Sequence, residues 1–324
     1  MQLKAPFPWF GGKSRVAHEV WRRFGEVKNY VEPFFGSGAV LLGRPGGAGP
    51  VETVNDKDGF VANFWRALAR DPGEVEGWAS EPVNENDLHA KHTWLLEQKK
   101  DLAPRLEADP DWFDARVAGY WVWGVCAWIG SGFCSGNGPW VVEDGRLVKS
   151  GSGGVHRQLP HLGTAGQGIN RQLPHLGTAG KGINSRTPTQ EWFSVLASRL
   201  ECVRVCCGDW SRVCGPSVTH KHGLTGVFLD PPYADTASRC DGLYAEDSMS
   251  VAHDVREWAI ANGDNPKMRI ALCGYEGEHE MPGDWSVFAW KTQGGFSTQS
   301  KDKSNQNKHR ERIWFSPACL GDVC

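Results

Sequence analysis

The feature that most constrains the fold is a unit of short apolar strand, small-residue turn and helix, which occurs twice near the start of the chain. A strand is predicted over residues 29–33, followed by the turn Gly36-Ser37-Gly38 and an apolar helix. A second strand, over residues 51–54, ends on Asn55-Asp56 and leads into a helix predicted over residues 60–70. Alternation of this kind favours an α/β fold with a parallel sheet and crossover helices.

The middle of the chain has a different character. Helical patterns over residues 86–106 and 112–129 carry Trp and Leu positions that suggest mutual packing, and a Gly-, Ser-, Asn- and Pro-rich stretch follows, with a possible hairpin over residues 140–148. Strand and helix alternation resumes only after about residue 190. Since domains average roughly 150 residues, a chain of 324 suggests two units. We predict a sheet domain formed by residues 1–70 and 187–324, with an inserted, mainly helical and loop-rich region at residues 71–186.

Positive charge is concentrated in two segments, although the whole chain carries a formal charge of only −3. Residues 145–190 hold six Lys and Arg side chains and no Asp or Glu, and residues 291–312 are also basic. One interpretation is a pair of solvated loops, and the other is a binding surface for a polyanion. The candidate contacts are Arg157, Arg171, Lys181, Arg186, Lys301 and Lys303.

The first basic segment contains a tandem repeat. Residues 157–170 recur as residues 171–184, with Lys181 in place of Gln167. Two copies are too few for a solenoid, which needs at least three. The repeat is therefore either a duplication without function or a pair of loops that presents the same basic groups twice.

A cluster of candidate catalytic residues follows an apolar strand predicted over residues 226–229. Asp230-Pro231-Pro232-Tyr233 comes where parallel α/β sheets place their ligands, beyond the carboxyl end of a strand. The two prolines lack N–H donors, which leaves the Pro231 carbonyl and the Asp230 carboxylate as acceptors, with the Tyr233 ring beside them as a stacking face. Such a group suits a planar ligand with an amino group that is to attack an electrophilic carbon. The simpler alternative is a strand that ends in a turn.

The glycine turn after the first strand is a candidate cofactor loop. Glycines at a strand-to-helix turn let a ligand approach the backbone closely, although a single Gly-x-Gly is weak support. The Asn55-Asp56 pair strengthens the interpretation, because a carboxylate after the second strand typically meets ribose hydroxyls.

Several blocks, in this order, resemble the DNA N6-adenine methyltransferases of the Dam-like type from bacteria and phages. These are residues 8–13 (PWFGGK), residues 30–38 (YVEPFFGSG), Asn55-Asp56, residues 207–210 (CGDW), residues 230–233 (DPPY) and residues 311–315 (ERIWF). The resemblance covers roughly residues 6–70 and 190–316. It is poor at residues 128–134, where the Asn- and Arg-rich pattern of GATC-methylating enzymes is missing, so the target sequence does not follow from it.

The resemblance implies a Rossmann-like methyltransferase sheet that binds S-adenosylmethionine, with the inserted region recognising a target in double-stranded DNA. An enzyme that acts on a base amino group must take the base out of the stack, and Tyr233 is then the expected stacking partner for adenine. The implied catalytic residues are Asp230, Pro231, Pro232 and Tyr233. The implied cofactor-binding residues are Trp9, Gly12, Lys13, Glu32, Pro33, Phe34, Gly36, Ser37, Gly38, Asp56, Asp209 and Asp230.

Other functions remain as alternatives. The acceptor is cytosine N4, RNA or protein in one of them, and in another the chain is a catalytically silent DNA-binding relative. No metal is expected, because the spacing of Cys202, Cys206, Cys207 and Cys214 to the nearby His220 and His222 misses the usual zinc patterns. Cys202 and Cys206 are instead expected to pack as small apolar residues beside the strand before Asp209. With no long apolar span and no secretory leader, the expectation is a cytoplasmic monomer without a membrane or an obligate protein partner.

Overall fold

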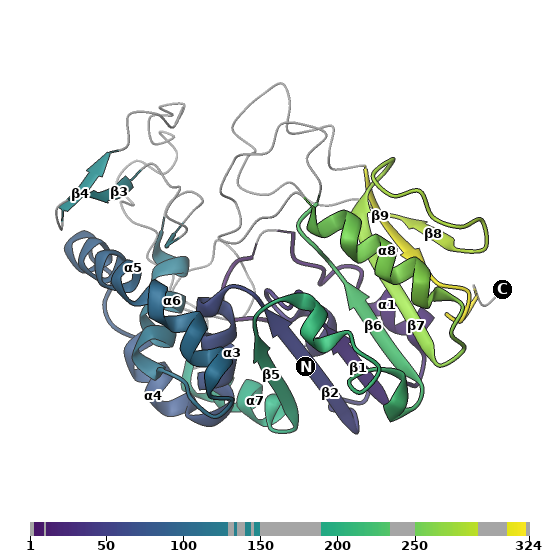
Figure 1. The fold of residues 1–324 in the computed structure, drawn as a ribbon. Coiled ribbons are helices and arrows are strands. Elements are labelled where there is room, and N and C mark those ends of the chain that lie inside the picture. The colour runs from purple at the N-terminus through teal and green to yellow at the C-terminus, as the bar shows by residue number, and fades with distance from the viewer. Residues whose placement is uncertain are drawn as a thin grey trace.

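The computed structural model has a seven-stranded sheet as its centre (Figure 1). The strand order is β5-β2-β1-β6-β7-β9-β8, with β9 antiparallel to both of its neighbours and the remaining pairs parallel. The strands are β1 (Asn29–Glu32), β2 (Val51–Asp56), β5 (Val203–Cys207), β6 (Thr225–Leu229), β7 (Met268–Tyr275), β8 (Ser286–Ala289) and β9 (Glu311–Phe315). The structure describes residues 3–9, 11–128, 133–134, 140–143, 146–149, 189–233, 250–290 and 310–321.

Helices cover both faces of this sheet. On one face α1 (Ala17–Phe24), α2 (Ala39–Leu42), α3 (Gly59–Arg70) and α7 (Thr189–Leu200) share a core with every second residue of the strands, such as Tyr30. On the other face α8 (Val251–Gly263) and the 3-10 turn η3 (Trp210–Val213) pack over Val31 and its neighbours. The alternation follows from the two-residue period of a strand. The predicted α/β fold is confirmed as a Rossmann-like sheet, and the antiparallel β9 is the part that strand and helix alternation does not predict.

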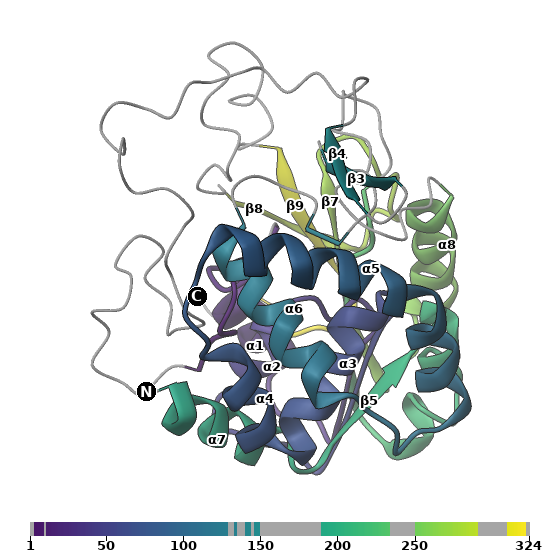
Figure 2. The same ribbon diagram turned by 90° about the vertical axis from the view of Figure 1, so that its left-hand side faces the viewer.

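The inserted helices lie beside α3 and continue its core (Figure 2). Asp71, Asn84 and Asp114 cap the first turns of these helices by accepting backbone N–H groups, which explains why each begins where it does. The elements are α4 (Pro72–Ala79), α5 (Glu85–Ala108) and α6 (Ala115–Ala127), followed by the hairpin strands β3 (Trp140–Glu143) and β4 (Arg146–Lys149). Among the described residues, none of the helices is long and apolar enough to cross a membrane.

Arg66 of α3 joins the inserted helices to the sheet. Its buried guanidinium donates to the carbonyl oxygens of Leu106, Asp109 and Trp112, which surround the end of α5, and to that of Val205 in β5. These four hydrogen bonds from its two terminal nitrogens fix the α5–α6 connection against the sheet.

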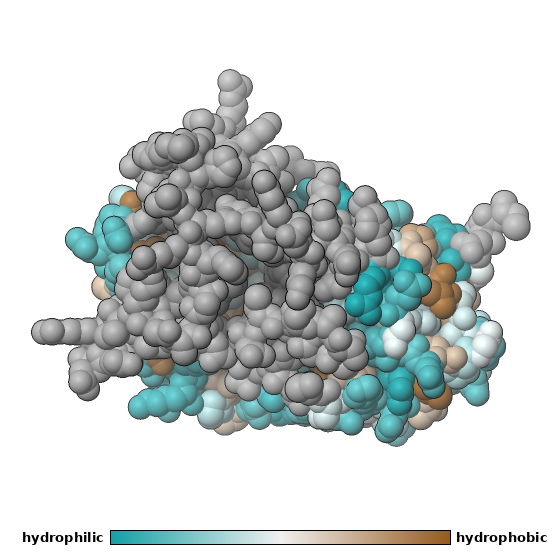
Figure 3. Space-filling view, turned by 90° about the horizontal axis from the view of Figure 1, so that it is seen from above, coloured by the Kyte–Doolittle hydropathy of each residue, from teal (hydrophilic) through white to brown (hydrophobic). Residues whose placement is uncertain are grey.

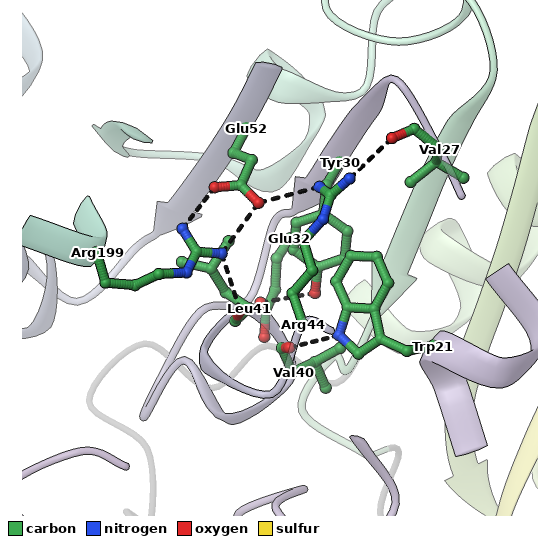
Figure 4. A network of polar contacts seen from close by, with 9 residues as sticks. All are labelled: Trp21, Val27, Tyr30, Glu32, Val40, Leu41, Arg44, Glu52 and Arg199. Atoms are coloured by element: carbon green, nitrogen blue, oxygen red, sulfur yellow. Dashed lines mark hydrogen bonds and ion pairs between the residues drawn. The ribbon is translucent and has the colours of Figure 1, made fainter. Parts of the chain in front are cut away.

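A second buried network holds α2, the short helix that follows the glycine turn (Figure 4). The carboxylate of Glu52, on β2, accepts two hydrogen bonds from Arg199 of α7, at 2.6 and 3.0 Å, and a third from Arg44. Arg199 also donates to the Leu41 carbonyl at 3.0 Å, and Trp21 donates to that of Val40 at 2.7 Å. The helix α2, which follows the glycine turn, is therefore held by hydrogen bonds from α7 and α1.

Candidate active site

The carboxyl ends of β1 and β6 lie side by side, as a parallel pair in register from Asn29 opposite Thr225. Asp230 directly follows β6, and Glu32 is the last residue of β1. Phe228 and Tyr30 lie on the same face of the sheet. Side chains two residues apart in a strand point to the same face, so Asp230 and Glu32 are expected on that face too. The predicted catalytic carboxylate is thus at the edge where α/β sheets bind ligands.

Lys13 forms a buried ion pair with Asp230. Its Nζ lies 2.8 Å from Asp230 Oδ2 and also donates to the Gly11 carbonyl at 2.9 Å, while the two side chains are 5% and 22% exposed. Burial opposes the charged form of Lys13, but Asp230 and Glu311 outweigh burial and raise the pKa of Lys13 above its ordinary value. The sequence blocks around residues 13 and 230 are therefore parts of one site.

Tyr233 is held in this site by residues of β7 and β9. Its hydroxyl donates to Glu311 Oε2 at 2.8 Å and lies 3.3 Å from Asp230 Oδ1. Its ring meets the ring of Tyr275 edge-on, with centroids 4.6 Å apart, and lies 5.4 Å from the Lys13 ammonium. Glu311 and Tyr275 begin β9 and end β7, and they are direct cross-strand partners. Sequence reasoning did not assign either residue to the site, since they come from strands whose pairing no local pattern predicts.

Two further carboxylates, those of Glu32 and Glu311, lie near Asp230 in the site. Burial raises the pKa of Glu32 well above its usual range, and the neighbouring Asp230 adds to this effect. Burial likewise raises the pKa of Glu311, against the opposing charge of Lys13. Glu32 also accepts a hydrogen bond from Tyr30 at 2.8 Å. Lys13 therefore provides the positive partner of Asp230 in a buried, acidic site.

The glycine turn is held by Asp56, whose two carboxylate oxygens accept the N–H groups of Gly36 and Asp58 at 2.8 and 2.9 Å. Burial raises the pKa of Asp56 to about 7, because the two backbone N–H groups only partly offset it. Sequence reasoning placed Asp56 against a cofactor ribose, and in the structure its carboxylate binds the loop. Asp56 thus shapes the glycine turn from β2.

The two turn glycines have left-handed backbone, with φ of +47° at Gly36 and +62° at Gly38. A Cβ at Gly36 would lie 2.4 Å from the indole Nε1 of Trp9, and one at Gly38 would lie 2.6 Å from the Phe35 ring. Gly12 faces the same turn, since a Cβ there would come 3.7 Å from Ser37 Oγ. Trp9 and Gly12 therefore lie against the glycine turn.

We expect the substitution Gly36→Val to abolish tight cofactor binding while the protein still folds. A β-branched side chain at positive φ is strained, and it would push away the Trp9 ring that covers the turn. Isothermal titration calorimetry with S-adenosylmethionine measures the loss, which we expect to be at least about tenfold in affinity.

The matched control is Gly277→Val, at another positive-φ glycine (+82°), where no atom of the described residues lies within 4 Å of the position that a Cβ would take. It should carry similar backbone strain but leave cofactor affinity unchanged. Equal affinity of the Gly36→Val variant and the wild type would mean that this turn does not bind the cofactor.

An aromatic pair lies on the opposite face of the sheet edge. The rings of Phe34 and Trp210 are nearly parallel, at 26°, with centroids 6.3 Å apart. Asp209 is exposed beside them, and its Oδ1 accepts from the backbone N–H of Ser211. Two half-buried aromatic faces next to a carboxylate fit a planar heterocycle that carries an amino group.

Pro33 and Pro231 are buried and Pro232 is half-buried, so the prolines shape the backbone at this edge. The six basic residues predicted to bind DNA, from Arg157 to Lys303, lie outside the described residues, as does the tandem repeat. The packing expected for Cys206 is confirmed, since it contacts the core around Val31. The same expectation is wrong for Cys202, which precedes β5 and is exposed.

The sheet order with its reversed strand is consistent with a Rossmann-like methyltransferase fold, and the candidate site lies at the ends of β1 and β6. Residues 9–101 match the family model of D12 class N6 adenine-specific DNA methyltransferases. The match confirms the resemblance found in the sequence, and the family that it names consists of adenine-specific DNA methyltransferases, which are enzymes. It covers β1, the glycine turn, β2 and α3, whereas Asp230 lies beyond it. A search of curated proteins gave no match.

Proposed function

We propose that the protein transfers the methyl group of S-adenosylmethionine to N6 of adenine in double-stranded DNA. The observation that carries the proposal is the carboxylate of Asp230, fixed by Lys13 at the end of β6 beside the glycine turn of β1. Methyltransferases of the matched family use this cofactor on DNA. The residues present fit it, because the Phe34 and Trp210 rings with Asp209 suit an adenine, and the turn that Asp56 holds at Gly36 follows Phe34 in the chain.

The cofactor supplies an electrophilic methyl group, and the protein contributes orientation and electrostatics. Asp230 and the Pro231 carbonyl accept the two hydrogens of the target amino group, which directs the nitrogen lone pair toward the methyl carbon. Lys13 holds the Asp230 side chain in place through their ion pair. The Tyr233 side chain borders the same space, and an adenine flipped out of the duplex would stack there.

We further propose that the inserted region, residues 71–186, recognises the DNA target, while residues 1–70 and 187–324 perform the chemistry. The described part of the inserted region supports this, because Arg66 holds the α5–α6 connection against β5. Contacts to the phosphate backbone would come from the two basic segments.

We propose a cytoplasmic monomer. All eight cysteines among the described residues are free thiols, as expected in a reducing compartment. On the face shown in Figure 3, the hydrophobic spots visible on the described residues are small and separate.

The proposal is tested by incubating the wild-type protein with methyl-tritiated S-adenosylmethionine and DNA that lacks methylated bases. We expect label in DNA and its recovery as N6-methyladenine after digestion to nucleosides. Label in N4-methylcytosine, or only in parallel incubations with RNA or protein, would assign another acceptor. No incorporation, despite DNA binding, would indicate a silent relative.

A further inference from the structure

We propose that Glu311 is a positioning residue for methyl transfer, because it engages the hydroxyl hydrogen of Tyr233 and so leaves an oxygen of Asp230 available to the substrate. The inference rests on the proposed function, in which Asp230 accepts the target amino group. Glu311 itself touches neither the amino group nor the methyl group in this proposal.

The hydroxyl of Tyr233 has two acceptors within reach. Glu311 Oε2 lies 2.8 Å away and Asp230 Oδ1 lies 3.3 Å away. A phenol carries one hydrogen, so the shorter contact with Glu311 takes it. The other oxygen of Asp230 is already bound to Lys13 at 2.8 Å. Glu311 therefore determines whether Asp230 keeps an acceptor oxygen for the substrate.

The placement of Glu311 is specific to this task. Its side chain belongs to a residue that is only 6% exposed, at the start of a strand whose next residues on the same face, Ile313 and Phe315, are core residues. Burying a carboxylate is costly unless it is hydrogen-bonded and compensated by charge, and here Tyr233 and Lys13 provide both. Its cross-strand partner Tyr275 packs on the same Tyr233 ring.

Removal of the Glu311 acceptor would free the phenol hydrogen for Asp230. The hydroxyl would then donate to Asp230 Oδ1 and compete with the amino group of the substrate. This consequence gives an unusual signature: removing the Tyr233 hydroxyl as well should restore activity, whereas damage to packing would only accumulate.

The experiment compares four variants with the wild type by steady-state methylation: Glu311→Leu, Glu311→Gln, Tyr233→Phe and the double variant Glu311→Leu/Tyr233→Phe. We expect Glu311→Leu to lower kcat about ten- to a hundredfold, with the KM for S-adenosylmethionine changed less than about threefold. Glu311→Gln retains an acceptor oxygen and should recover most of kcat. The double variant should be as active as Tyr233→Phe and more active than Glu311→Leu.

Glu276→Leu serves as the control. Glu276 is 62% exposed and pairs with Arg312, the neighbour of Glu311 on β9, so its loss should leave kcat unchanged. Thermal unfolding and calorimetric binding of S-adenosylmethionine show whether each variant is folded. If Glu311→Leu does not fold, Glu311→Ala replaces it, and the same order of kcat values among the variants is expected.

The inference is overturned if Glu311→Leu keeps kcat within twofold of the wild type. It is also overturned if the double variant is less active than both Glu311→Leu and Tyr233→Phe. These results differ from failure of the proposed function, in which the wild type itself incorporates no label into adenine and both ideas fall together.

Discussion

The substitution Asp230→Ala is expected to reduce methyl incorporation at least about a hundredfold, because it removes the carboxylate that orients the target amino group. Lys13 would lose its partner at 2.8 Å, although Glu311 stays nearby to offset the buried charge. The rate is measured with labelled cofactor at saturating DNA. Binding of S-adenosylmethionine, followed by calorimetry, should decrease far less than the rate.

Asp230→Asn separates shape from charge in the same experiment, since the amide keeps one acceptor oxygen but cannot pair with Lys13. The exposed Asp111, 83% accessible, provides the control Asp111→Ala. If Asp230→Ala keeps more than a tenth of the wild-type rate, the catalytic role of this carboxylate is wrong.

The substitution Arg199→Ala is expected to lower the free energy of unfolding by about 3 kcal/mol, since it leaves the buried Glu52 without its two-bond partner. Arg44 retains one contact with Glu52, which keeps the effect at the lower end for a broken buried pair. Urea unfolding followed by circular dichroism measures the change. Because Arg199 also binds the Leu41 carbonyl, affinity for S-adenosylmethionine should fall with it.

Arg70→Ala is the matched control for this prediction. Arg70 pairs with Asp111 at 3.2 Å, but the two side chains are 60% and 83% exposed, so solvent screens the pair. Its loss should change the free energy of unfolding by less than about 1 kcal/mol. A destabilisation by Arg199→Ala no greater than that of Arg70→Ala would show that the Glu52 network contributes little to stability.

Local patterns predict the parallel half of the sheet well. The strand predicted over residues 29–33 is β1, and the helix predicted over residues 60–70 is α3, because strand periodicity and turn glycines are encoded within a few residues. The position of Asp230 follows in the same way, from an apolar run that ends in two prolines.

The remainder of the site depends on contacts between strands that are far apart in the sequence. The pairing of β7 with β9 brings Tyr275 opposite Glu311, and neither residue belongs to a short motif with a chemical signature. The local signal at Glu311 is an acidic residue at the head of an apolar strand, which is equally typical of a solvent-exposed strand end. The contact between Asp56 and the glycine turn was also out of reach of local patterns, because its carboxylate accepts a backbone N–H group from a turn 20 residues earlier.

The site is assembled from groups far apart in the order of synthesis. Lys13 pairs with Asp230 across 217 positions of the chain, and Tyr233 reaches Glu311 across another 78. A ribosome synthesises the N-terminal end of a chain first, so Lys13 is made long before Asp230 and Glu311. While a ribosome is still making the first two thirds of the chain, the glycine turn can form but the acceptor group cannot. The proposed site is therefore among the last parts of the structure that folding completes, and it is complete only when β9 has paired with β7.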